Sequence, residues 1–261
     1  MTIRNRLASA LLALTLAGSA AAPALAADTA SATEAKPTIV LVHGAFADGS
    51  SWNKVIPLLQ AKGYKAIAVQ NPLSSLEDDV TAAKRIIDAQ TGPVVLVGHS
   101  WAGTVITQAG ADDKVKALVY VAAFAPAQDE TSVESVKGFP ASPGLAKVVK
   151  SPDGYLTLPA EAVASDFAQD VPKSESSLIA ATQGPVRAAN FEQKVSVAAW
   201  SSKPSWYIVA ANDRMIDPGA ERALAKKIHA KTTELKTSHV PMVSNPQAVA
   251  NVILDAAKSV R

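Results

Sequence analysis

The sequence predicts an α/β fold whose mostly parallel, doubly wound sheet is covered by helices on both faces. Its 261 residues are 48% hydrophobic, which is enough for a single domain with a full core. Short, unbroken apolar runs predict strands that are buried on both faces. Stretches with helical spacing separate these runs, and this alternation is typical of parallel strands joined by crossover helices.

The first half of the domain starts at Pro37 and follows this alternation closely. Strands are expected at residues 38–42, 64–69 and 94–98. A helix is expected at 51–61, where Gly63 would end it in a left-handed turn. A second helix is expected after Ser75, because a hydroxyl followed by acidic residues is typical of a helix N-cap.

The second half contains a long interruption. A strand is expected at 115–124, and residues 127–204 then lose the alternation, are rich in proline and carry scattered aromatic side chains. An insertion at the carboxyl edge of such a sheet is typical of a lid, and we expect a helical one. Its aromatic residues would either line a substrate pocket or, as we favour, form the interior of the lid: Phe139, Tyr155, Phe167, Phe191 and Trp200.

The alternation returns after the lid. Strands are expected at 205–211 and 232–237. Asp217-Pro218 and Asn245-Pro246 each place a capping side chain before a proline at the first helical position, which predicts two further helices.

Composition narrows the class of function. The chain carries 25 basic and 23 acidic residues, and without Arg4 and Arg6 the two counts are equal. A near-neutral domain lacks the basic surface of a nucleic-acid-binding protein, so we expect a small-molecule substrate and no nucleic-acid partner. There is no cysteine, so disulfides, thiol chemistry and thiolate metal sites are excluded. The sequence does not predict the oligomeric state.

The N-terminus predicts export. Arg4 and Arg6 precede an apolar stretch at 7–17, which is too short to span a membrane, and Ala24-Leu25-Ala26 has the small residues of a cleavage site. We therefore expect a signal peptide at 1–26, a linker at 27–36 and the domain at 37–261. The mature protein would be periplasmic or secreted, with no membrane attachment after cleavage.

Ser100 is the candidate nucleophile. It follows the apolar run that ends at Gly98 and directly precedes a helical stretch, so it would stand on a sharp strand-to-helix turn at the carboxyl end of the sheet. We expect Gly98 and Ala102 to be small so that the strand and the helix can approach each other.

A serine hydroxyl needs a base, and the base needs an orienting carboxylate. Asp213 and His239 follow two later strands, so the three side chains are expected at one edge of the sheet. Asp217 is the alternative carboxylate, but it has a sufficient role as a helix cap. The alternative histidines are assigned other positions: His43 in the first loop, His99 within the turn and His229 late in a helix.

An oxyanion formed at the substrate needs two fixed donors. The backbone N–H of Trp101, next to the nucleophile, would be one of them. The other would come from the loop after the first strand, with Ala45 preferred and Phe46 second. No metal or other cofactor is implied by these residues.

Three segments resemble the α/β-hydrolase superfamily, and within it the group of plant methylesterases, hydroxynitrile lyases and bacterial pyrethroid-type esterases. They are residues 40–46 with Ser51-Trp52, residues 97–103, and residues 238–242 with Asn245-Pro246. The segment 118–126 is similar as well. The resemblance implies an α/β-hydrolase fold with a lid and a triad of Ser100, Asp213 and His239.

Departures from the group favour one of its reactions. Hydroxynitrile lyases carry a lysine where this chain has Val240, and a threonine where it has Gly44. We therefore expect a serine hydrolase that cleaves small, apolar carboxylic esters. The same triad could instead act on lactone, amide or C–C bonds or in perhydrolysis. The other class of function is a small-ligand-binding relative without catalysis, which a fluorophosphonate label would distinguish.

Overall fold

The central element is a six-stranded parallel sheet. The computed structural model describes residues 36–260, so the predicted signal peptide and residues 27–35 of the predicted linker lie outside them. The strands are β1 (Thr38–Val42), β2 (Ala66–Val69), β3 (Val94–His99), β4 (Val115–Val121), β8 (Ser205–Ala210) and β9 (Lys231–Leu235). Their spatial order is β2-β1-β3-β4-β8-β9, and every neighbouring pair is parallel. The predicted fold class is confirmed.

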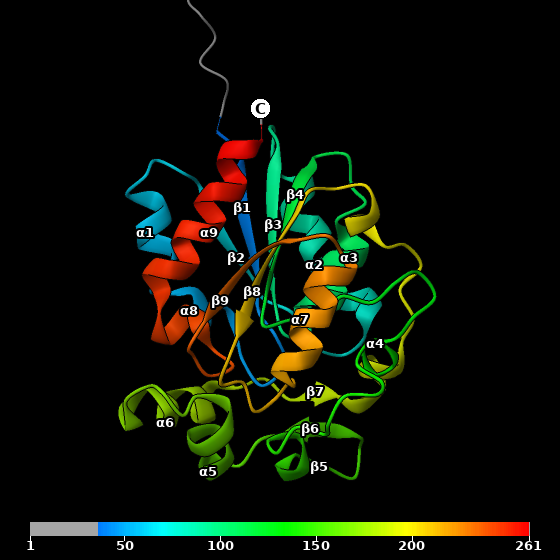
Figure 1. The fold of residues 1–261 in the computed structure, drawn as a ribbon, viewed down its shortest axis with the longest axis vertical. Helices are drawn as coiled ribbons and strands as arrows, with labels where there is room; N and C mark the ends of the chain where they lie inside the picture. The colour runs from blue at the N-terminus through cyan, green and yellow to red at the C-terminus, as the bar shows by residue number, and fades with distance from the viewer. Residues whose placement is uncertain (1–35, 261) are drawn as a thin grey trace, which may run out of the picture. The chain divides into compact units, whose positions relative to one another are not determined.

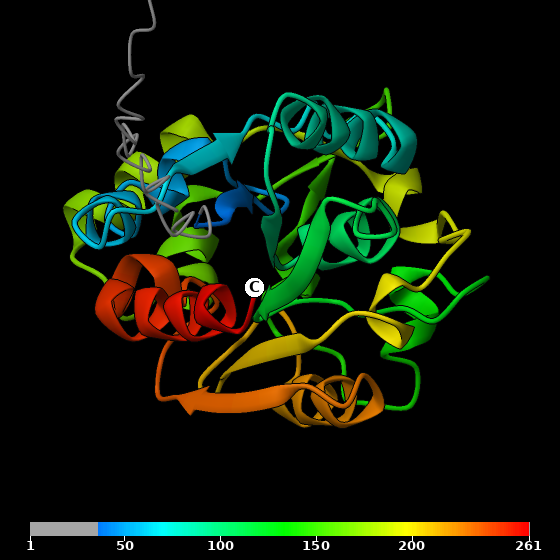
Figure 2. The same ribbon diagram turned by 90° about the horizontal axis from the view of Figure 1, so that it is seen from above.

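Helices cover both faces of this sheet (Figures 1 and 2). One face is covered by α1 (Ile56–Gln60) and α9 (Pro246–Ser259), and the other by α2 (Leu76–Asp88), α3 (Ala102–Ala109) and α7 (Pro218–Lys227). Three predicted N-caps are confirmed, since Ser75, Asp217 and Asn245 each accept a backbone hydrogen bond from the first turn of their helix. These caps satisfy donors that the helix itself leaves unpaired.

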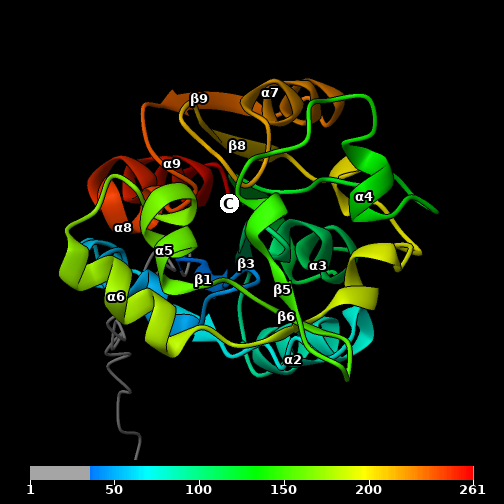
Figure 3. The ribbon, with the colours of Figure 1, turned by 90° about the horizontal axis from the view of Figure 1, so that it is seen from below.

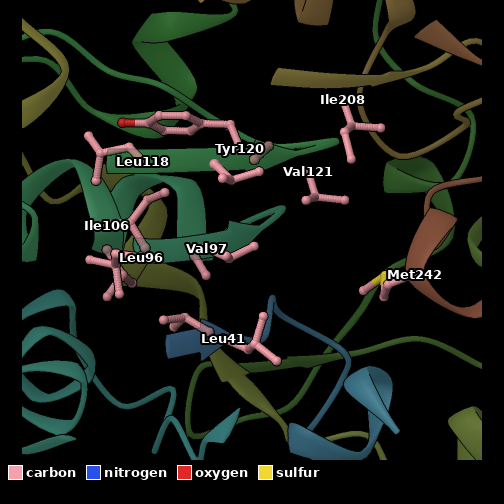
Figure 4. Packing of buried hydrophobic residues seen from close by; sticks show 14 of the residues in the cluster. Leu41, Leu96, Val97, Ile106, Leu118, Tyr120, Val121, Ile208 and Met242 are labelled. Carbon is pink, nitrogen blue, oxygen red and sulfur yellow. The ribbon is translucent and has the colours of Figure 1, made fainter. Parts of the chain in front are cut away.

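The core lies between the sheet and these two helix layers. All five residues of β1 are buried, and so are all six of β3 and of β8. Figure 4 shows Leu96 and Val97 of β3 beside Leu41 of β1 and Leu118 of β4. Burial of each such side chain contributes on the order of 1.5–3 kcal/mol. The strand ends are therefore held by a rigid core, which fixes the loops that follow them.

The order in which the chain adds strands to the sheet reverses between β1 and β3. The chain runs from β1 outward to β2 and then crosses back to place β3 on the other side of β1. At such a point the loops after the two central strands diverge and leave a crevice at the carboxyl edge. The loop after β1 and the turn after β3 both start there.

The insertion between β4 and β8 lies across the carboxyl ends of the strands (Figures 1 and 3). It contains α4 (Ser132–Ser135), α5 (Ala160–Ala162) and α6 (Lys173–Thr182). It also contains a small antiparallel sheet of β5 (Val149–Lys150), β6 (Tyr155–Thr157) and β7 (Val186–Arg187). We expected helices here, and the insertion is instead a mixture of helices and strands.

Both ends of the insertion are bonded to the sheet. The Ala122 N–H donates to Ile208 O, and the Leu118 N–H donates to Pro204 O. The segment therefore leaves β4 and returns to β8 on adjacent strands.

Two predicted helical features are wrong in detail. The helix expected at 51–61 is broken into a 3₁₀ turn at Gly49–Trp52 and the short helix α1. Pro57 explains the break, because a proline lacks the N–H of a helix interior and clashes with the preceding turn. His229, expected late in a helix, lies just after α7 with a left-handed φ of 52°.

Within residues 36–260, no helix is both long and apolar enough to cross a membrane.

Candidate active site

Ser100 occupies the turn between β3 and α3. Its φ is 54°, a left-handed value that costs about 1 kcal/mol or more in a residue other than glycine. Three hydrogen bonds hold this conformation. The Ser100 N–H donates to Val121 O at 3.1 Å, and Ser100 O accepts from Gly103 N–H at 2.9 Å and from Phe124 N–H at 3.2 Å. The strained turn points the hydroxyl away from the sheet.

Three glycines make room for this turn. A Cβ on Gly98 would lie 2.6 Å from Ala102 O, and one on Gly103 would lie 2.0 Å from Phe124 O. A Cβ on Gly44, in the loop after β1, would lie 2.8 Å from the Ser100 Cβ. These distances are shorter than van der Waals contact, so each position needs glycine. The small residue expected at 98 is confirmed, because Gly98 lies against the backbone of Ala102 at the start of α3. Gly103 lies instead against the segment that follows β4.

The three candidate triad side chains meet in one hydrogen-bonded chain. His239 Nε2 lies 2.8 Å from Ser100 Oγ, and His239 Nδ1 lies 2.5 Å from Asp213 Oδ2. The second oxygen of Asp213, Oδ1, accepts hydrogen bonds from the backbone N–H groups of Met215 and Ile216. The carboxylate is therefore fixed by its own loop, and it can hold the imidazole with the Nδ1 proton toward Asp213 and Nε2 free to accept from the serine.

The alternative carboxylate is used elsewhere. Asp217 accepts hydrogen bonds from the backbone N–H groups of Gly219 and Ala220 at the start of α7. The structure therefore gives Asp217 the capping role expected for it, and brings Asp213 to the histidine.

The other two buried histidines support the loops. Asn71 N–H donates to His43 Nε2 at 2.9 Å, which ties the loop after β1 to the segment after β2. His99 Nε2 donates to the carbonyl oxygen of His239 at 2.8 Å. Burial lowers the pKa of both side chains, so both are neutral near pH 7. A neutral His99 can support the backbone of His239 without adding a charge beside its ring.

Backbone donors flank the Ser100 hydroxyl. The N–H groups of Trp101, Ala45 and Phe46 have no acceptor within residues 36–260, and Ala45, Phe46 and Ser100 line the same cavity. This is where the oxyanion donors were expected. Phe46 has a left-handed φ of 57°, which turns the loop sharply at that residue.

A buried carboxylate holds the side chain of Trp101. Asp79, in the first turn of α2, accepts the Trp101 indole N–H at 2.7 Å and the Leu73 N–H at 2.8 Å. Burial raises the pKa of Asp79 to about 6. The sequence indicated a turn of acidic residues here, but nothing in it distinguished the one that faces inward.

A largely apolar cavity of about 740 Å³ opens above Ser100 and His239. Such a volume is typical of small-molecule sites. Two of the aromatic residues noted in the insertion, Phe139 and Phe191, line this cavity. Phe167 instead packs edge-to-face against the His239 ring. The remaining apolar lining comes from the lid, from the loops after the strands and from the start of α7: Ala45, Phe46, Phe124, Val133, Val136, Pro140, Ala141, Leu145, Val148, Leu156, Ala188, Met215, Ile216 and Ala220.

The described part of the chain, 36–260, contains no group of three or more histidine or acidic side chains arranged to hold a metal ion.

Comparison with known proteins agrees with this architecture. The profile of the Alpha/beta hydrolase family matches residues 39–252, and the chain belongs to this family. It is 27% identical over 250 residues to a probable hydrolase, R7, of a Phoma species, covering 85% of this chain and 98% of the relative. It is 26% identical over 264 residues to methylesterase 2 of Arabidopsis thaliana, covering 85% and 96%.

A solved structure of a pyrethroid hydrolase, PytH, superposes with a TM-score of 0.74 at 22% identity, covering 86% of this chain and 98% of that one. This likeness shows the fold. In sequence, the chain is also 27% identical over 247 residues to a pyrethroid hydrolase of Sphingobium wenxiniae, covering 84% of this chain and 87% of the relative. The expected resemblance to methylesterases and pyrethroid hydrolases is confirmed, and so is the hydrolase class of the chain.

Proposed function

We propose that the protein is a serine hydrolase that cleaves small, largely apolar carboxylic esters. The observation that carries this proposal is the hydrogen-bonded chain from Ser100 Oγ through His239 to Asp213, at the floor of an apolar cavity. The similarity to a methylesterase supports ester substrates. The apolar lining supports uncharged acyl and alcohol groups, because it offers few polar partners to a charged one.

The mechanism follows from this geometry. Ser100 Oγ attacks the acyl carbon while its proton passes to His239 Nε2, and Asp213 stabilises the imidazolium that forms. The backbone N–H groups of Trp101 and Ala45 bind the developing oxyanion. His239 then protonates the leaving alcohol and afterwards activates water, which releases the acid from Ser100.

A Ser100→Ala variant tests the mechanism. We expect hydrolysis of short p-nitrophenyl esters to fall by at least about 10⁴-fold, leaving only the contribution of binding and oxyanion donors. A variant that kept the parent's activity would refute the role of Ser100.

Fluorophosphonate labelling separates catalysis from simple ligand binding. An activated serine reacts rapidly with this probe, so the parent should be labelled and Ser100→Ala should not. A parent that binds apolar ligands but resists labelling would be a binding protein. A panel of matched esters, lactones and amides then identifies the bond that is cleaved.

We also propose that the mature enzyme is periplasmic or secreted. This rests on the basic residues Arg4 and Arg6, the apolar stretch after them and the Ala24-Leu25-Ala26 site. Cell fractionation and N-terminal sequencing of the mature protein test it, and a start at Ala27 is the expected result.

A further inference from the structure

Helix α7 carries a carboxyl group on its buried side. Glu221 is 0% exposed and lies one turn before the buried Leu224 and Ala225. Its Oε2 accepts a hydrogen bond from Ala210 N–H at 2.9 Å. Asp213 adjoins the same strand end, since its N–H donates to Ala210 O at 3.0 Å. The Oε1 atom of Glu221 is buried and has no hydrogen-bond partner within residues 36–260.

Within residues 36–260, no lysine or arginine forms an ion pair with Glu221 or Asp213. The neighbouring Arg222 turns outward and forms a two-pronged ion pair with Glu234, where both side chains are nearly half exposed. The buried Tyr207 hydroxyl donates to the carbonyl of Ala123 and so is not available to Glu221. Glu221 and Asp213 are both buried and the charge of Asp213 acts on Glu221. Two such neighbouring carboxylates, without a cation between them, cannot both remain ionised.

Only one of the two carboxyls can give up its charge without loss of the proposed chemistry. Asp213 already accepts three hydrogen bonds, from Met215 N–H, Ile216 N–H and the His239 ring, and an ionised carboxylate has about four acceptor sites. The fourth site is free for a donor. A protonated Glu221 supplies one O–H, and its carbonyl oxygen still accepts from Ala210.

We propose that Glu221 is a positioning residue that remains protonated and donates a hydrogen bond to Asp213. The proton stays on Glu221 throughout the reaction, and no bond to substrate is made or broken there. Its role is to hold the Asp213 carboxylate against strand β8, so that the carboxylate cannot turn away from His239. The catalytic part of this inference rests on the proposed esterase function, whereas the protonation state does not.

The electrostatics of the site agree with this arrangement. Burial, and after it the charge of Asp213, raise the pKa of Glu221 well above its ordinary value. The charges that face it are Asp213 on one side and, further out, Arg222. Tyr207 also faces this pair and is neutral, because burial raises the pKa of its hydroxyl far above the ordinary value.

Infrared difference spectroscopy at pH 8 tests the protonation directly. The parent minus Glu221→Gln spectrum should contain the C=O stretch of a protonated carboxylic acid. At this pH Asp79 is ionised and does not contribute. Glu234→Gln is the matched control, since it removes an exposed, paired carboxylate and should not change this band. Absence of the band from the parent would overturn the proposal whatever the enzyme hydrolyses.

The pH profile of kcat/KM tests the positioning role. The side-chain amide of Glu221→Gln keeps the same shape, donates to Asp213 and accepts from Ala210, so the acidic limb should stay in place and kcat should remain within about threefold. If Glu221 were ionised, the same change would remove a negative charge beside Asp213 and His239. The acidic limb would then move to lower pH by about one unit, which would overturn the proposal.

Glu221→Leu removes the donor and keeps a similar volume. We expect kcat, measured per fluorophosphonate-reactive site, to fall about 10–100-fold with little change in KM. The acidic limb should shift to higher pH, because an Asp213 with one donor fewer stabilises the imidazolium more strongly. A merely structural Glu221 would lower the number of reactive sites but leave kcat per site and the limb unchanged, and that result would contradict the positioning role.

Discussion

The Asp79 carboxylate accepts a 2.7 Å hydrogen bond from the Trp101 indole. A residue of α2 therefore fixes the side chain that directly follows the candidate nucleophile. The lid completes this contact, since Phe191 packs against the Trp101 ring with a centroid distance of 5.2 Å. The turn that presents Ser100 is thus held from the sheet, from a helix and from the insertion.

Replacing Asp79 by Asn should change how stability depends on pH. The native pKa of Asp79 is raised to about 6, so the native state binds this proton more tightly than the unfolded state. The stability that this group contributes is fully present below its ordinary pKa. It is lost as pH rises through about 6, by about 3 kcal/mol in all.

The free energy of unfolding, measured with urea at pH 4 and pH 7, tests this. The free energy of unfolding of the parent, relative to that of Asp79→Asn, should be higher at pH 4 than at pH 7. Equal differences at the two pH values would show that Asp79 has an ordinary pKa.

Asp213→Asn should lower kcat by about 10⁴-fold on p-nitrophenyl esters, because an amide leaves the histidine in the wrong tautomer. Asp217→Ala is the comparison, since it removes a carboxylate from the same loop. Loss of this cap should cost about 1 kcal/mol of stability and lower kcat less than about tenfold. If the two variants lost activity equally, the assignment of Asp213 would be wrong.

Gly103→Ala should disrupt the turn. The added Cβ would lie 2.0 Å from Phe124 O, so α3 and the segment after β4 must separate, at a cost of about 1–3 kcal/mol or more. Ala102→Gly changes the neighbouring residue by the same methyl group in the opposite direction and should cost no more than about 1 kcal/mol. Thermal unfolding of both variants measures the contrast, and similar stability for the two would contradict it.

Phe191→Ala should weaken the binding of large apolar esters. The ring lines the cavity and contacts both Trp101 and Phe124, so its removal enlarges the cavity and loosens the Trp101 side chain. We expect KM for a long-chain p-nitrophenyl ester to rise about tenfold, with a smaller effect on the acetate. Leu178→Ala, on the exposed surface of α6, is the control and should change neither. An equal KM change for both esters would exclude a role of Phe191 in size selection.

The sheet, and the position of Ser100, Asp213 and His239 at one edge of it, could be predicted from the sequence because buried parallel strands have a clear sequence pattern. Each is a short apolar run, and the polar residues directly after it must lie at the carboxyl edge. Because all three residues lie at this edge, their side chains can come into contact.

Other features left weaker signals. Pro57 stands inside an otherwise regular apolar spacing, so the broken helix at 51–61 could have been predicted by giving proline more weight than periodicity. The two- and three-residue strands of the insertion are too short to show alternation. They form because the two ends of the insertion are fixed on β4 and β8 and the segments between them pair with one another.

Glu221 and Asp79 were not identified because each occurs in a setting where acidic residues are common. Asp79 follows Glu77 and Asp78 in a first turn that favours negative charge, and only the fold turns it inward. Glu221 did leave a signal, since it shares the helical spacing of Leu224 and Ile228. A carboxyl group on an apolar stripe must find a partner in the interior.

The insertion begins after β4 and ends before β8, and hydrogen bonds at Ala122 and Pro204 fix its two ends to the sheet. The candidate triad and the oxyanion loop all come from segments outside the insertion. Recombination of this segment between relatives would therefore exchange most of the cavity wall in one step and leave the chemical groups untouched. A chimaera joined at these two points should inherit the substrate range of the donor and keep the reaction of the recipient.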